Sequence, residues 1–197
     1  FKQITISCFR NICSSNPDNS YCEKAWVIRG TDIPEARYCN LLKVPLRFHK
    51  KSNLKTRRLV QGDIIFEVSG GSKNQPLGRA LLITPEHHRA FDGIPFIPAS
   101  FCKRIHPESN KYASEIFYLS ILEAYTSGEI EQFQVQSTGI SNFKWSDYIE
   151  RVVRCIPPIE IQKHFKEMVI PMFSEISTLG LKNNILRRTR DLLLPKL

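Results

Sequence analysis

The sequence contains no long hydrophobic run. No stretch approaches the roughly 18–20 apolar residues that a membrane-spanning helix requires, so we predict that the protein does not cross a membrane. The first residues also lack a basic segment followed by an apolar stretch and a small-residue cleavage site. We therefore expect no secretory signal and a cytoplasmic location.

The sequence also lacks cysteine and histidine residues at the spacings of a zinc site. The six cysteines include no Cys-x-x-Cys pair, and no histidine stands where it would complete a zinc site. We predict no metal site and reduced thiols, as is usual in the cytoplasm. Because the number of cysteines is even, a disulfide framework stays open as the alternative.

Motifs that carry catalysis are scarce. Gly70-Gly71 matches neither the Gly-Lys-Ser/Thr ending of a Walker loop nor the Gly-x-Gly-x-x-Gly pattern. The acids near Asp18 and Glu108 do not have the spacing of a nuclease metal site. His87 and His88 have no acid at a ligating offset, and we interpret them as a solvated loop tip. We expect no catalytic residues and no cofactor.

Positive charge is abundant and concentrated. The chain has 28 Lys and Arg against 19 Asp and Glu, a net charge of +9. Residues 43–60 contain no acid, and apolar residues alternate with the cations there, as in a strand or loop that packs on one side. This pattern predicts contacts to DNA phosphates, with a merely solvated face as the alternative. The seven cations are Lys43, Arg47, Lys50, Lys51, Lys55, Arg57 and Arg58.

A polar loop follows the basic segment. Residues 63–68 and 79–83 read as two strands that frame it. Its glycines allow close backbone approach, and Lys and amide side chains can pair with base edges in the major groove. The alternative is an ordinary polar hairpin. We expect the DNA-contacting residues of this region to be Ser72, Lys73, Asn74, Gln75 and Arg79.

Strand and helix signals alternate irregularly along the rest of the chain. Residues 25–30 and 151–156 read as strands, residues 96–101 as a further apolar stretch, and residues 113–126 as a helix with apolar positions three and four apart. Residues 134–143 read as a strand and a turn. We predict an α+β fold, with a mixed sheet and peripheral helices in a domain over residues 1–156.

The C-terminal segment, residues 157–197, is different in kind. Proline opens it, and a helix over residues 159–194 would be about 50 Å long. Its mostly apolar positions follow a 4,3 spacing that predicts packing against a second helix. An amphipathic helix lying on its own domain is the alternative. The pairing positions are Phe165, Val169, Met172, Ile176, Leu179, Asn183, Leu186, Arg190 and Leu193.

Four segments resemble one known family when they are taken in order. Residues 62–72 and 75–80 resemble the target recognition domain of the specificity subunits of type I restriction–modification enzymes. Residues 137–143 resemble a later turn of that domain. Residues 157–165 and 188–197 resemble the start and end of the spacer helix in these subunits.

The resemblance implies a non-catalytic subunit that recognises one half of a bipartite site in double-stranded DNA. It also implies a spacer helix that packs antiparallel on a second one, from a second copy or a second half of a longer subunit. The implied partners are methyltransferase (modification) subunits, which use S-adenosylmethionine, and a nuclease (restriction) subunit. The alternatives are the DNA-recognition portion of a larger single-chain methyltransferase and a helix-mediated scaffold that does not bind DNA.

Overall fold

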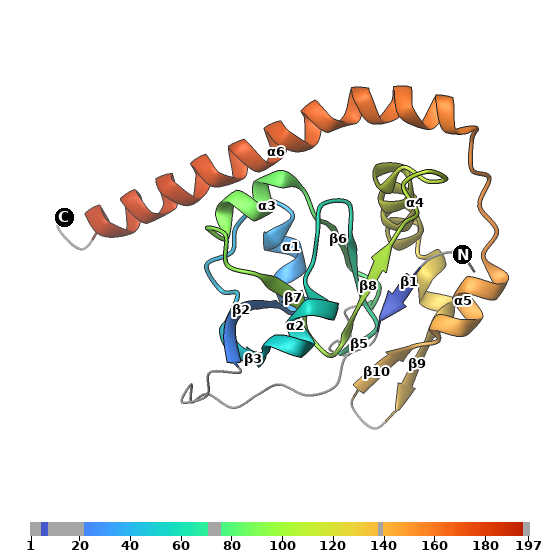
Figure 1. Cartoon of the computed structure of the whole chain (residues 1–197), viewed down its shortest axis with the longest axis horizontal. Coiled ribbons are helices and arrows are strands. Elements are labelled where there is room, and N and C mark those ends of the chain that lie inside the picture. The colour runs from blue at the N-terminus through green and yellow to red at the C-terminus, as the bar shows by residue number, and fades with distance from the viewer. Residues whose placement is uncertain (1–4, 8–21, 71–75, 138–139, 195–197) are drawn as a thin grey trace.

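The computed structural model describes residues 5–7, 22–70, 76–137 and 140–194. It is a mixed α/β fold with three small sheets and one long C-terminal helix, which agrees with the predicted α+β class (Figure 1). None of the helices in the described ranges is long and apolar enough to cross a membrane.

The central sheet has four antiparallel strands in the order β1-β8-β4-β6. The strands are β1 (Thr5–Ser7), β4 (Ile64–Glu67), β6 (Ala80–Leu82) and β8 (Cys102–His106). Every residue of β4 and β6 is buried. Both faces of this sheet are therefore covered, which explains why β4 begins with three consecutive apolar residues without alternation.

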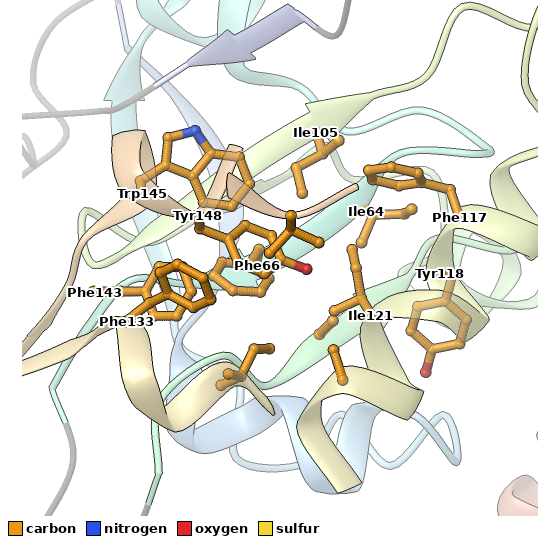
Figure 2. Close-up of a cluster of buried hydrophobic side chains, with 14 of the residues drawn as sticks. Ile64, Phe66, Ile105, Phe117, Tyr118, Ile121, Phe133, Phe143, Trp145 and Tyr148 are labelled. Carbon is orange, nitrogen blue, oxygen red and sulfur yellow. The ribbon is translucent and has the colours of Figure 1, made fainter. Parts of the chain in front are cut away.

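One face of the central sheet carries an aromatic core. Phe66 lies 5.0 Å from Phe143 and 5.1 Å from Trp145, measured between ring centroids, and Figure 2 shows Phe133 and Tyr148 beside them. The covering elements are α4 (Ser114–Thr126), the 3-10 helix η2 (Glu129–Phe133) and α5 (Trp145–Arg151). The α4 helix coincides closely with the predicted helix at residues 113–126.

The opposite face packs on a second sheet with the order β3-β2-β7. In it β2 (Cys22–Ile28) pairs antiparallel with β3 (Leu46–Lys50) and parallel with β7 (Phe96–Pro98). The 3-10 helix η1 (Gly30–Asp32), α1 (Ile33–Ala36) and α3 (Pro85–Ala90) complete this core.

A third sheet and a short helix stand on the side of the molecule away from the C-terminal helix (Figure 1). The sheet has the order β5-β10-β9, with β5 (Ser69–Gly70), β9 (Gln134–Ser137) and β10 (Ile140–Phe143). The short helix is α2 (Lys51–Arg57), which follows β3 directly.

The long helix α6 (Ile159–Leu193) has nearly the predicted bounds. It arches along one side of the domain (Figure 1). Pro171 lies inside it and cannot donate a backbone hydrogen bond, a known cause of helix bending. Its contacts with the domain extend from Gln162 to Arg187, so much of its length lies against its own domain.

Three local predictions were wrong. Residues 152–158 form no regular element, because β-rich sequence makes a strand only where a partner strand is available, and Pro157-Pro158 cannot donate to one. The basic segment contains the helix α2, whose single buried residue, Leu54, gives too little periodicity to be seen. His87 and His88 lie on α3, and His87 is buried because its ring bonds to Ala36 across the core.

Candidate nucleic-acid interface

The basic segment forms one strand–helix unit made of β3 and α2. Leu54 and His49 point into the domain, which leaves the intervening side chains outside. Lys51 and Lys55 are four residues apart and share one exposed helix face. Arg57 is half-buried, and burial lowers its pKa from the ordinary value. The exposed cations are Lys43, Arg47, Lys50, Lys51, Lys55 and Arg58.

The described part of the chain supplies no acid that pairs with the exposed cations of this surface. Within the described ranges, none of these six exposed cations forms an ion pair with a carboxylate. Lys24, on the neighbouring strand β2, adds a further exposed cation and lies 5.7 Å from the centroid of the Phe48 ring. Unpaired cations on one surface are a suitable binding site for a polyanion.

The end of α2 is fixed to the central sheet by Arg104. Its guanidinium donates hydrogen bonds to the carbonyl oxygens of Thr56 (3.3 Å) and Arg58 (3.2 Å). It also pairs with Asp63 at 3.0 Å. A cation at the C-terminal end of a helix is favourable because the free carbonyls there carry partial negative charge. The basic helix therefore has a defined position on the domain.

Arg79 is placed differently from the other predicted DNA contacts. It is buried, and its guanidinium binds the buried carboxylate of Glu67 at 2.7 and 2.5 Å. This guanidinium is therefore not available to DNA in this structure, which corrects the predicted contact. The ion pair instead joins the end of β4 to the residue before β6, on either side of the polar loop. The loop residues Ser72, Lys73, Asn74 and Gln75 lie outside the described residues.

Glycine at position 30 makes room for this ion pair. A side chain there would overlap the carboxylate of Glu67, because the Gly30 main chain lies directly against it. The Glu67–Arg79 pair is thus held between η1 and the central sheet.

A hollow of about 600 Å³, which the sequence reasoning missed, opens between β5, β10 and the start of α5. Ser69 donates a hydrogen bond of 2.8 Å from its hydroxyl to Oδ1 of Asn142, its cross-strand neighbour. The hollow also contains Lys103, whose Nζ lies 5.7 Å from the centroid of the Trp145 ring, and Lys144. Together they place cations, an amide and an indole in one concavity. The adjacent Lys144-Trp145 pair was the only sequence signal.

The helix α6 presents two faces. One contacts the domain: Gln162 accepts a hydrogen bond from the Ala113 N–H (2.7 Å), and Ser174 donates one to Glu86 (3.0 Å). Most predicted pairing positions lie away from this face. Phe165 and Val169 are partly covered, whereas the exposed positions are Met172, Ile176, Leu179, Asn183, Leu186, Arg190 and Leu193.

The described residues were also searched for metal-binding groups and for paired cysteines. The described residues include no group of three or more His, Cys, Asp or Glu side chains that could hold a metal ion. Among the described cysteines, Cys39, Cys102 and Cys155 are free thiols. No protein-family model matches the chain, and no curated protein matches it in sequence.

Proposed function

We propose that this protein is the DNA-specificity subunit of a type I restriction–modification system and recognises one half of a bipartite site. The observation that carries the proposal is the basic strand–helix unit, β3 and α2. Its exposed cations have no carboxylate partners within the described ranges, and it lies on the side of the domain away from α6 (Figure 1).

The charge pattern favours a nucleic acid over a merely solvated surface. Surface Lys and Arg are usually interspersed with acids, which limits mutual repulsion. Here Lys50, Lys51, Lys55 and Arg58 follow each other on a short unit without a single acid between them. Such a unit gains most of its binding free energy from counterions that phosphate contacts release.

Sequence-specific recognition needs groups that reach base edges. The hollow beside β10 offers Asn142, held in place by Ser69, together with Lys103. Amide and cationic side chains are the groups that pair with adenine and guanine edges. The strand β5, which ends at Gly70, pairs with β10 beside this hollow.

The remaining parts of the proposal come from the family resemblance. The subunit itself has no active site and works in the cytoplasm. Methyltransferase and nuclease subunits bind to it, and α6 packs against a second spacer helix that connects to a second recognition domain. The exposed apolar positions of α6 support this role, because a helix used only to cover its own domain would not need them.

A second candidate is a scaffold protein that uses α6 for assembly and does not bind DNA. The same exposed apolar positions favour it, and they do not depend on the basic surface. The DNA-recognition portion of a larger methyltransferase would share the basic surface and differ only in what is attached to the chain.

A salt titration separates DNA binding from the scaffold. The purified protein is added to a fluorescent duplex, and the dissociation constant is measured by anisotropy between 50 and 200 mM salt. For about six phosphate contacts we expect affinity to fall on the order of a thousandfold over this range. Absence of binding at 50 mM salt would favour the scaffold.

A further inference from the structure

An apolar groove of about 580 Å³ opens where the second half of α6 passes the domain. Trp26, Leu42 and Phe91 line it from the domain. Leu181 and Ile185 line it from α6. This volume lies within the range of about 300–1,000 Å³ that is usual for small-molecule sites. We call this concavity the α6 groove.

The domain side of the α6 groove is aromatic and held in place. The ring centroids of Trp26 and Phe91 lie 5.7 Å apart, and those of Phe91 and Phe96 lie 4.6 Å apart. Trp26 is fixed on both sides of its strand, because its neighbours in the sheet are Leu46 on β3 and Phe96 on β7. A flat apolar molecule therefore meets a preformed surface and does not have to order it.

Apolar side chains along the groove remain uncovered. Ile185 is 64% exposed, and Leu42 on the domain side is 66% exposed. Neither Leu181 nor Ile185 belongs to the positions predicted to pair with a second helix. That pairing therefore gives no reason for apolar residues here, whereas a ligand in the groove would remove them from water.

The polar groups of the α6 groove favour an anion. The ten described residues that line it include no acid. One of them, Arg188, is exposed and forms no ion pair within the described ranges. The indole Nε1 of Trp26 is buried and has no hydrogen-bond partner in the described structure. A buried N–H without an acceptor costs free energy, so a ligand that brings an acceptor gains affinity.

We propose that the α6 groove binds a small apolar anion of the class of aromatic carboxylates. The aromatic part packs against Trp26 and Phe91 on one side and against Ile185 on the other. The carboxylate pairs with Arg188, and the Trp26 N–H donates to an oxygen of the ligand. A guanidinium and a carboxylate form charge-assisted hydrogen bonds, which fix the orientation of such a ligand.

The size of the groove favours this ligand over a protein partner. A stable protein interface uses about 20–30 residues on each side. Only ten of the described residues line the α6 groove. A small molecule, by contrast, buries most of its surface in a concavity of this volume. A second copy of the chain is therefore an alternative that the experiment has to exclude.

A ligand in the α6 groove contacts the domain and the helix at once. It therefore binds only the arrangement in which α6 is docked, and it stabilises that arrangement by mass action. This inference goes beyond the proposed function and requires no DNA. The experiment is done without DNA, so that its failure and a failure of DNA binding are distinguishable.

Tryptophan signals provide the test, because the chain has two tryptophans and only Trp26 lines the groove. The isotope-labelled full chain is titrated with naphthoate, and the two indole N–H signals are followed by NMR. A Trp145→Phe variant assigns them. We expect the Trp26 signal to move in a saturable way, with a dissociation constant of about 1 mM or lower, while the Trp145 signal stays in place. Naphthamide, the neutral counterpart, should bind at least about tenfold more weakly.

Substitutions at exposed positions of α6 locate the site. Arg188→Gln removes the cation and should raise the dissociation constant of naphthoate about three- to fivefold. Ile185→Asp places an acid in the groove and should abolish the Trp26 shift. Lys182→Gln is the matched control, because it removes an exposed cation of α6 that does not line the groove. All three variants should keep the circular dichroism spectrum of the wild type.

A Trp26 signal that stays in place at about 10 mM naphthoate would overturn the proposal. Equal binding of the carboxylate and the amide would contradict an anion site. Equal effects of Arg188→Gln and Lys182→Gln would place the ligand elsewhere. A Trp26 signal that moves with protein concentration before any ligand is added would show that a second copy occupies the groove.

Discussion

Gly180 of α6 lies directly against the main chain of Tyr38, so closely that a side chain at position 180 would overlap the carbonyl oxygen of Tyr38. Two more residues hold the helix at the same turn. Ser177 is buried at this turn, and the side chain of Asn184 donates a hydrogen bond to the Cys39 carbonyl at 3.4 Å. This turn after α1 is the central contact between α6 and its domain.

Replacement of Gly180 therefore tests whether α6 is docked as the structure shows. Gly180→Ala should lower the free energy of unfolding by about 1–3 kcal/mol, because the added methyl group has no space and forces the helix away from Tyr38. Chemical denaturation measures this loss. Thr189→Ala, on the exposed end of α6, is the control and should change stability by less than about 0.5 kcal/mol. Equal effects of the two variants would mean that the helix is not docked at this turn.

The buried ion pair gives a second prediction. Arg79→Ala leaves the carboxylate of Glu67 buried without its partner and should destabilise the protein by about 3–5 kcal/mol. A double variant, Glu67→Gln with Arg79→Met, removes both charges and should cost clearly less. Urea unfolding of the two variants provides the comparison. If the double variant were less stable than Arg79→Ala, the loss of stability would come from lost packing and not from an unpaired charge.

Stability should depend on pH through two buried histidines. Burial is the main cause that lowers the pKa of both His49 and His87 from the ordinary value. The ring of His87 is held neutral by its contacts: Nε2 donates to the Ala36 carbonyl, and Nδ1 accepts from the Thr84 N–H. Neither ring nitrogen of His49 has a partner in the described structure.

The unfolded chain takes up these protons near pH 6.5, whereas the folded protein does so only at lower pH. Stability should therefore be complete above about pH 6.5 and fall as the pH decreases below it. Each histidine contributes up to about 1.4 kcal/mol per pH unit in that window. His49→Leu should reduce the slope of unfolding free energy between pH 7 and 5. A slope equal to the wild-type value would show that His49 titrates normally in the fold.

The basic helix predicts a change in the salt dependence of DNA binding. Lys51→Ala with Lys55→Ala removes two exposed cations from one face of α2, so the slope of log K against log salt should decrease by up to about two. The matched control is Lys163→Ala with Arg188→Ala, which removes two exposed cations from α6. If both pairs changed the slope equally, the protein would bind DNA through its total charge and not through α2.

The hollow beside β10 should affect specificity more than general affinity. Asn142→Ala should cost about 1–3 kcal/mol on the preferred sequence and little on random DNA, because base contacts carry the sequence information. Competition binding with the two duplexes measures the difference. Ser146→Ala, at the rim of the same hollow, is the control. Equal losses on both duplexes would assign Asn142 to the DNA backbone.

Long periodic elements could be predicted from the sequence, and short or non-local ones could not. The helices α4 and α6 repeat their apolar residues over several turns, and β4 begins with three consecutive apolar residues, so their positions were predicted within a few residues. The helix α2 buries only Leu54, and one buried residue gives no periodic pattern of apolar positions in the sequence.

In the candidate site, too, the features that are local in sequence could be predicted and the non-local ones could not. The exposed cations of residues 43–58 could be predicted because they are adjacent in sequence. The burial of Arg79 could not, because it depends on Glu67 in the neighbouring strand. The hollow joins Ser69 to Asn142, which are 73 residues apart, through strand pairing that local sequence does not specify.

Selection from a random-sequence duplex library tests the central claim most directly. The purified protein is mixed with the library at about 100 mM salt, bound duplexes are recovered, and their sequences are compared over successive rounds. Our account predicts enrichment of one short sequence of a few base pairs, or of two inverted copies at a fixed spacing if the chain dimerises through α6. Bound duplexes without any shared sequence, or no bound duplexes at all, would contradict a specificity subunit.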